Sequence, residues 1–343
     1  MLSPLSRVLL SLLTLPLAFL ANGAFAATPN VLIFTATTGF RHDSIPVAVE
    51  ALQQQAERAN VNWTHTEDSS HFNDGALEAY DGVVFLSASG EVFNDQQKAA
   101  FQSWLNKGGN FVGIHSATDC LLKTDFYRRE IGAYFDYHPD IQEASVNVID
   151  PGHPSTDHLP RPWIVRDEWY NFKSDPRDVG AVVILSADEN SYEDNGPRNP
   201  AQGTPHPTAW FQERGAGVEE GQTAGRSFYT SLGHLNETWQ DETFMTHVLG
   251  GLSWALQSNT TRAFNASGVV GAIGDPSDTT ASGDSTSQTE SETETSLTEV
   301  ANPSSDTTTT DDGAESSAAH STVSAAVGLF TILNALHLVH REL

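Results

Sequence analysis

Cysteine is almost absent from this sequence, because Cys120 is the only one among 343 residues. A single thiol excludes an internal disulfide framework and a cluster of thiolate metal ligands. Basic residues are also scarce: 17 Lys and Arg stand against 44 Asp and Glu, and the formal net charge is −27. A field of that sign repels phosphate backbones, so nucleic acid is excluded as a general partner. The sequence also lacks a Gly-rich phosphate loop and a dinucleotide-binding fingerprint, which argues against a nucleotide cofactor.

Residues 1–26 have the organisation of a secretory signal peptide. A basic start is followed by an apolar run over residues 8–20, and small residues at Ala24 and Ala26 precede the expected cleavage site. An uncleaved membrane helix is the alternative, but the run is short for a bilayer. We therefore expect a protein of the secretory pathway.

A second apolar stretch, within residues 323–343, ends the chain and follows a segment of polar and small residues. This order predicts a GPI-anchor signal, and a retained single membrane span is the alternative. Either one would hold the protein at a membrane, on the extracellular face of the cell or in its wall. The candidate attachment residues are Asp312, Gly313, Ser316 and Ser317.

The folded part of the chain is expected at residues 27–258, which contain every tryptophan. Residues 259–322 hold eleven acidic residues and one basic residue, and they are rich in Ser and Thr. A segment of this composition buries too little apolar surface to offset its conformational entropy, so it predicts a disordered stalk. Four N-x-S/T sequons fit glycosylation in the secretory pathway: Asn62, Asn236, Asn259 and Asn265.

Apolar runs and helical patterns alternate through the expected domain. Residues 30–37 and 82–87 are nearly continuous apolar runs, which are typical of strands buried on both faces. Further strands are expected at residues 62–66, 110–114, 144–148, 181–186, 208–212 and 226–232, and helices at residues 45–60, 94–107 and 241–256. This alternation predicts a doubly wound, flavodoxin-like α/β domain, in which a mainly parallel sheet carries helices on both faces.

Polar side chains follow several of these strands, at the sheet edge where ligands bind in folds of this kind. Arg41 and His42 follow the first strand. His115 and Asp119 follow the strand at 110–114, and His234 follows the last strand. A single histidine in a loop is ordinary, but three at equivalent positions of one sheet predict a common site. Histidine transfers protons near neutral pH and also binds zinc and similar metals.

Eight short motifs are spread over residues 29–256: Gly39–His42, Gly113–Asp119, Phe135–Pro139, Gly152–Pro154, Asp167–Phe172, His206–Trp210, Leu232–His234 and Gly250–Ala255. In this order they resemble the ThuA-like (trehalose-utilisation) family. That family is similar in fold to class I glutamine amidotransferases, which implies a flavodoxin-like sheet. The resemblance also implies a role in the metabolism of trehalose or a related disaccharide.

The resemblance places His115 where the amidotransferases have their nucleophile. Those enzymes carry a cysteine in a tight strand-to-helix turn flanked by glycines, and the corresponding turn here resembles Gly113–Ala117. A histidine forms no thioester, so glutamine amidotransferase activity is not expected. Cys120 lacks the flanking glycines and is interpreted as a small buried hydrophobe. Ser116 has no identifiable base or oxyanion donors, which argues against a serine nucleophile.

The expected site suits chemistry on a saccharide, whose hydroxyls and apolar ring faces call for carboxylates, histidines and aromatic rings. Glu168 is the first candidate carboxylate, and Asp119 is the second. Trp169 and Trp210 are candidate substrate-binding platforms, with core packing as an equal alternative.

A divalent metal ion is a further alternative at the same place, and the sequence leaves the cofactor open. His42, His115 and His234 could bind such an ion together with Glu168. No pair of these residues has the short spacing of a helical zinc motif, so the pattern alone does not favour a metal.

Two functions of different classes follow from these residues. In the first, a secreted, surface-tethered enzyme acts on a saccharide or keto-sugar as a hydrolase, isomerase or lyase. His115 and His42 would be its acid–base groups and Glu168 their carboxylate partner. Arg41 and His234 would orient hydroxyls or a developing oxyanion. In the second, the domain is a non-catalytic carbohydrate-binding module displayed on a stalk.

Overall fold

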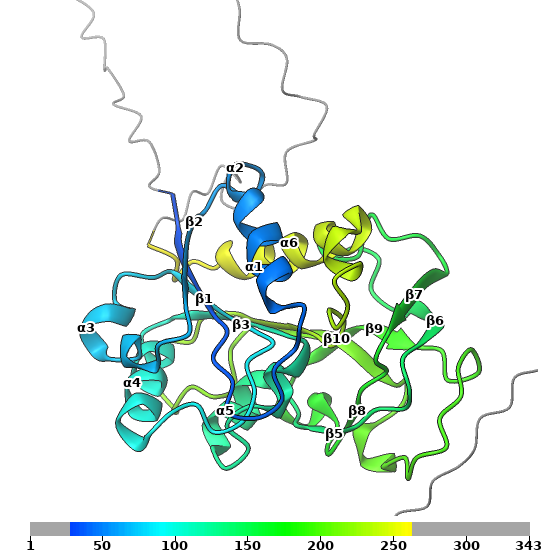
Figure 1. Ribbon diagram of the computed structural model, residues 1–343. Helices are drawn as coiled ribbons and strands as arrows, with labels where there is room; N and C mark the ends of the chain where they lie inside the picture. Colours follow the sequence, from blue (N-terminus) through cyan, green and yellow to red (C-terminus); the bar gives the residue numbers. More distant parts are fainter. Residues whose placement is uncertain (1–27, 263–343) are drawn as a thin grey trace, which may run out of the picture. The chain divides into compact units, whose positions relative to one another are not determined.

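The computed structural model describes residues 28–262 and contains a sheet of nine strands in the order β2-β1-β3-β4-β11-β10-β9-β6-β7 (Figure 1). A separate pair, β5 and β8, forms a second small sheet. The strands are β1 (Asn30–Phe34), β2 (Asn62–Thr66), β3 (Gly82–Leu86), β4 (Asn110–Ile114), β5 (Phe135–Tyr137), β6 (Gln142–Val148), β7 (Trp163–Asp167), β8 (Asn171–Phe172), β9 (Val182–Ala187), β10 (Pro207–Gln212) and β11 (Ser227–Thr230).

The large sheet has a parallel half and an antiparallel half. The strands β2, β1, β3, β4 and β11 are mutually parallel, as in a flavodoxin-like fold. From β11 onward the pairs with β10, β9, β6 and β7 are antiparallel. The predicted α/β class and its parallel, flavodoxin-like part are confirmed, and the sheet continues beyond them as an antiparallel extension.

Helices cover both faces of this sheet. They are α1 (Ile45–Gln54), α2 (Ala56–Ala59), α3 (Asp74–Leu77), α4 (Asp95–Asn106), α5 (Asp125–Ile131) and α6 (Glu242–Leu256). In Figure 1, α1 and α6 lie on one side of the sheet and α4 and α5 on the other. Consecutive residues of β1 alternate between the two cores, since Val31 and Ile33 join the first and Leu32 and Phe34 the second. Burial on both faces explains the uninterrupted apolar run of this strand.

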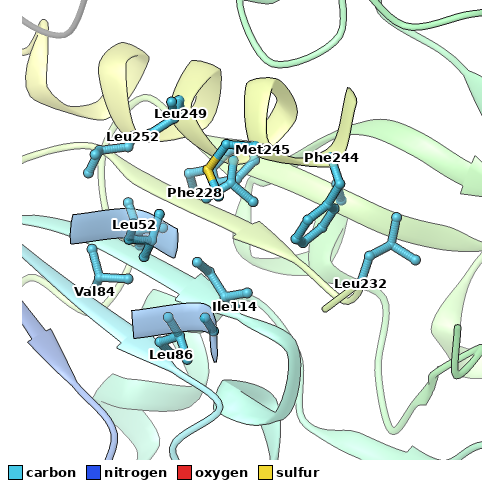
Figure 2. Close-up of a cluster of buried hydrophobic side chains, with 14 of the residues drawn as sticks. Leu52, Val84, Leu86, Ile114, Phe228, Leu232, Phe244, Met245, Leu249 and Leu252 are labelled. Atoms are coloured by element: carbon cyan, nitrogen blue, oxygen red, sulfur yellow. The ribbon is translucent and has the colours of Figure 1, made fainter. Parts of the chain in front are cut away.

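The first core lies between the sheet and the helices α1 and α6 (Figure 2). Leu52 of α1 and Met245 of α6 pack there with Leu86 and Ile114 from the ends of two parallel strands. The second core is rich in aromatic rings, with Phe85 stacked on Phe101 of α4. These two cores hold the ends of the parallel strands in place, and the polar residues follow those ends.

Several element boundaries differ from the sequence-based expectation. The helix expected at 45–60 is interrupted at Gln55, where the backbone leaves helical geometry (φ −91°, ψ 12°). The first strand was expected to reach residue 37 but ends at Phe34. Thr37 pairs with Ser89 only through an isolated bridge. The pattern did not predict α3, α5, β5, β7 and β8.

Three of the four sequon asparagines, Asn62, Asn236 and Asn259, are exposed, and their glycosylation stays a prediction. The fourth, Asn265, lies outside the described residues. So do the predicted signal peptide, most of the stalk, the C-terminal tail and all four candidate anchor residues. Within residues 28–262, no helix is long and apolar enough to cross a membrane.

Candidate active site and metal centre

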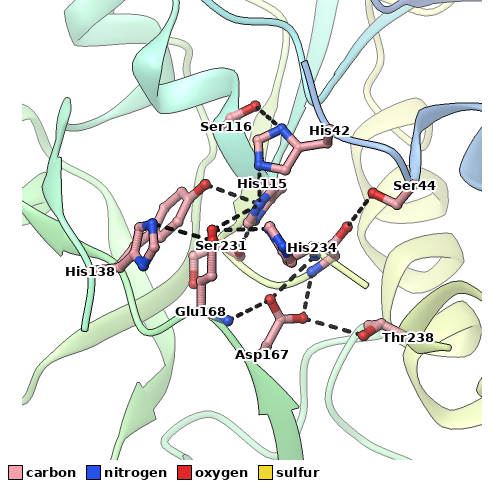
Figure 3. A network of polar contacts seen from close by, with 12 residues as sticks. His42, Ser44, His115, Ser116, His138, Asp167, Glu168, Ser231, His234 and Thr238 are labelled. Atoms are coloured by element: carbon pink, nitrogen blue, oxygen red, sulfur yellow. Dashed lines mark hydrogen bonds and ion pairs between the residues drawn. The ribbon is translucent and has the colours of Figure 1, made fainter. Parts of the chain in front are cut away.

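His115 occupies the turn that follows β4, at the edge where the parallel strands end (Figure 3). Its φ of 54° lies in the left-handed region that a non-glycine residue rarely adopts. A tight turn of this kind after a strand aims the side chain outward from the end of the sheet. Gly113, two residues earlier, packs closely on α5, since a Cβ there would lie 2.2 Å from Ile131 Cδ1 and would displace that side chain.

The ring of His115 is fully buried and has one defined tautomer. Its Nδ1 lies 2.7 Å from the carbonyl oxygen of Ser231, which can only accept, so Nδ1 carries the proton. In the neutral ring the lone pair is on Nε2, which lies 3.0 Å from His42 Nε2 and 3.0 Å from the Tyr170 hydroxyl. A carbonyl that fixes the distant nitrogen is the usual arrangement behind a metal-binding histidine.

Glu168 is the carboxylate at the centre of the cluster. Its Oε2 lies 3.4 Å from His115 Nε2 and 3.1 Å from His234 Nδ1, while its Oε1 lies 3.2 Å from His138 Nε2. Burial opposes its charge, but the histidines outweigh burial and hold the pKa of Glu168 well below its usual range. Glu168 is therefore an anion at neutral pH.

Two of the histidines have opposite electrostatic surroundings. Burial, reinforced by the neighbouring His115 and His234, lowers the pKa of His42 to about 3, so this ring is neutral. Burial also acts against the charge of His234, but the adjacent Glu168 carboxylate outweighs it and raises the pKa. The cluster thus combines an anionic oxygen with two imidazoles whose pKa values are shifted in opposite directions.

The carboxylate of Asp167 holds this arrangement in place. It is fully buried and accepts backbone N–H groups of Glu168 at 2.8 Å, Gly233 at 2.9 Å and His234 at 3.2 Å. The end of β7 is thereby tied to the loop after β11, as Figure 3 shows. Asp167 binds the backbone of Glu168 and His234 and not their side chains, so it is a positioning residue.

Four side chains lie close enough to bind one metal ion. His42, His115, Glu168 and His234 each offer one ligand atom, and these atoms lie within 4.8 Å of one another. Zinc bonds of about 2.0–2.2 Å at tetrahedral angles separate neighbouring ligand atoms by about 3.3–3.6 Å. The closest pairs here are 3.0, 3.1 and 3.4 Å apart.

A second observation supports the same ligand set. Glu168 Oε2 and His234 Nδ1 are buried and form an ion pair at 3.1 Å, and neither atom makes a further hydrogen bond. A cation placed between them would give both atoms a partner in place of this contact. The residues present therefore fit a divalent metal ion.

The structure separates the other candidates from this cluster. Arg41 pairs with Glu67 at 2.7 Å on the surface, so its guanidinium is already engaged and does not reach the histidines. Asp119 is half-buried and lies outside the four-residue set; burial raises its pKa. Cys120 is fully buried, which raises the pKa of its thiol, as expected of a small buried hydrophobe.

Trp169 and Trp210 are core residues and not sugar platforms. Each is 1% exposed. The Trp169 indole N–H donates to the carbonyl of Gln142, and the Trp210 indole N–H donates to the carbonyl of Ile131. Neither ring presents a free face, so the core-packing alternative holds for both.

Three residues of the site were not predicted from the sequence. His138 contacts Glu168, the Tyr170 hydroxyl contacts His115, and Asp167 supports both ends of the cluster. His138 lies within the motif Phe135–Pro139, and the other two flank Glu168. Their position inside these motifs was the one signal that pointed to them.

Comparison with known proteins connects this geometry to a family. The family of trehalose-utilisation proteins named ThuA matches residues 30–255. The chain belongs to the ThuA family. A search of curated proteins gives no match.

Two solved ThuA-like proteins have a similar fold. One, from Bacteroides uniformis ATCC 8492, superimposes with a TM-score of 0.57 at 20% identity, over 72% of this chain and 99% of its own. Another, from Parabacteroides merdae ATCC 43184, has a TM-score of 0.50 at 20% identity, over 67% of this chain and 90% of its own. These similarities establish that the ThuA domain here has the architecture of its solved relatives.

Proposed function

We propose that the ThuA domain is an enzyme that processes a saccharide or keto-sugar at the cluster of His42, His115, Glu168 and His234. The convergence of these four groups from separate strand ends is the observation that carries the proposal. The family description, trehalose utilisation, supports a sugar as the substrate class. The histidine at the turn after β4 leaves no cysteine for amidotransferase chemistry.

A divalent metal ion, held by these four residues, would act as a Lewis acid on a carbonyl or hydroxyl oxygen of the sugar. Tyr170 is suited to donate a hydrogen bond, because burial raises the pKa of its hydroxyl well above the usual range and keeps it protonated. His138 lies on the more open side of Glu168, with a third of its side chain exposed. It is placed to exchange protons with a bound substrate.

A cleft of about 350 Å³ lies beside His138 and gives a substrate room near the cluster. Tyr137, Asp140, Glu193 and Asp194 are among its lining residues. Carboxylates and a phenol are suitable partners for sugar hydroxyls. The cleft is lined by His138, which contacts Glu168, and by none of the four cluster residues, so it supports a subsite beside the cluster for part of a polyol substrate.

The proposed location is the extracellular face of the cell, through secretion and a GPI anchor. The signal-peptide pattern at residues 1–26 and the tail at residues 323–343 support it. Release of the protein from intact cells by a phosphatidylinositol-specific phospholipase would agree with this location. Retention after that treatment would favour a single membrane span.

Turnover of a sugar panel tests the proposed activity. The panel contains disaccharides and their keto derivatives, and the protein is assayed after chelation and after addition of individual divalent metals. We expect product from the unmodified protein, loss with His115→Ala, and no change with His158→Ala, an exposed histidine that pairs with Asp157.

Two outcomes would contradict the enzyme. Saccharide binding without turnover under every metal condition would establish a carbohydrate-binding module. Absence of both binding and turnover would exclude a saccharide as the ligand and would favour a structural role.

A further inference from the structure

Phe40 is the one exposed residue among the Phe, Tyr and Trp of the described part of the chain, with 65% of its surface accessible. It stands two residues before His42, in the loop after β1. Its ring meets the His42 ring edge-on, with centroids 4.7 Å apart. The His42 ring in turn contacts His115 and His234. An apolar ring thus projects into solvent directly beside the four-residue cluster.

The backbone under Phe40 is firmly held, so the exposure of the ring is not that of a loose loop. The carbonyl of Phe40 accepts a hydrogen bond from the Ser89 hydroxyl at 2.6 Å. The N–H groups of Thr38 and Gly39 both donate to the carbonyl of Ser89. A Cβ on Gly90 would lie 2.5 Å from Gly39 N, so the two loops interlock through glycine. The backbone is therefore ordered before binding, and the contact with His42 fixes the side of the cluster on which the ring lies.

The surroundings of Phe40 favour a small ligand over a protein or a membrane. Its neighbours in the chain, Thr38, Gly39 and Arg41, are exposed and not apolar, so Phe40 does not belong to an apolar run of this loop. Interfaces with proteins and lipids require larger apolar areas. A single aromatic ring next to polar, hydrogen-bonding groups instead matches a ligand with one apolar face and several hydroxyls.

We infer that Phe40 is the sugar platform of this site: its ring stacks on the C–H face of a saccharide ring whose hydroxyls reach the His42–Glu168 cluster. The inference rests on the proposed function and specifies the substrate as a cyclic sugar. It assigns to Phe40 the role that Trp169 and Trp210, both buried, cannot fill. Phe40 binds and positions the substrate and takes no part in proton transfer.

The test compares the kinetics of Phe40→Ala, Phe40→Trp and a control on the best substrate of the sugar panel. We expect Phe40→Ala to raise KM about three- to tenfold, the range that aromatic contacts of this kind give, with a smaller change in kcat. Phe40→Trp should keep KM near its original value. Val182→Ala, which truncates an exposed apolar side chain at the start of β9, should change neither constant.

A second readout does not depend on turnover. In Phe40→Trp, the added indole is exposed, so saccharide binding should shift its fluorescence to shorter wavelength, whereas the unmodified protein should show no such shift. Turnover with an unchanged KM in Phe40→Ala would overturn the platform while the proposed function stands. Failure of the unmodified protein to bind any saccharide would overturn both. Loss of vesicle or protein association in Phe40→Ala, with KM unchanged, would also overturn the platform.

Discussion

Glu130 allows a stability prediction that can be worked out from its surroundings. The side chain is 1% exposed and belongs to none of the ion pairs among residues 28–262. Its Oε2 accepts one hydrogen bond, from the N–H of Gly217 at 2.9 Å. Burial is the largest influence on this carboxyl and raises its pKa to about 7. The folded protein therefore binds a proton at Glu130 more tightly than the unfolded chain does.

The sign of the pH dependence follows from linkage. A carboxyl with a raised pKa in the folded state stabilises the fold fully below the unfolded value of about 4.5, and this contribution is lost as the pH rises through about 7. The difference between these pKa values corresponds to about 3 kcal/mol. Glu130→Gln cannot ionise, so it should be more stable than the original protein at pH 8, by up to about 3 kcal/mol.

Urea denaturation at pH 4.5, 6 and 8 measures this difference. The gap between Glu130→Gln and the original protein should be small at pH 4.5 and widen toward pH 8. Glu143→Gln, an exposed position on β6, is the matched control and should show no such widening. A gap that stays constant with pH, or a less stable Glu130→Gln at pH 8, would refute the reasoning. The stabilised variant would also serve as a background for substitutions in the active site.

Three further predictions concern positioning, packing and acid stability. Asp167→Asn should weaken metal binding about 10- to 100-fold, because it replaces one of the two oxygens that accept the N–H groups of Glu168, Gly233 and His234 with an NH2 group, which cannot accept. Titration calorimetry with zinc measures this, and unchanged affinity would contradict the positioning role. Trp210→Phe should lower the free energy of unfolding by about 1–3 kcal/mol, measured by thermal denaturation, because the indole hydrogen bond in the core is lost. The KM for a sugar should stay unchanged. A raised KM would show that Trp210 contributes to substrate binding. Burial lowers the pKa of His247 to about 3, so below about pH 6.5 the unfolded chain binds a proton there that the folded protein does not, and stability should fall. His247→Asn should make this decline shallower in denaturation curves. An equally steep decline would exclude His247 as its source.

The strands of the parallel half could be predicted because their burial pattern is local. β1 and β3 are buried on both faces, and this produces unbroken apolar runs. β7 was missed because it lies at the edge of the sheet, pairs only with β6 and exposes Ile164. Its burial alternates, but its residue types do not follow that alternation, because apolar Ile164 is exposed and charged Asp167 is buried.

The three clustered histidines could be predicted because the direction of a strand decides where the residue after it lies. His42, His115 and His234 each follow a parallel strand, and the sheet brings them to one edge. Side-chain direction within loops and strands is set by packing, so the orientations of Trp169 and Arg41 could not be predicted. Trp169 turns into the core, and Arg41 turns to Glu67.

Anomalous scattering from crystals of the protein grown with zinc tests the central claim most directly. The account predicts one strong peak among His42, His115, Glu168 and His234, at about 2.0–2.2 Å from each ligand atom. It also predicts that the peak disappears in Glu168→Gln while the fold is retained. A map in which zinc occupies other sites and leaves the space between Glu168 Oε2 and His234 Nδ1 without a peak would contradict it.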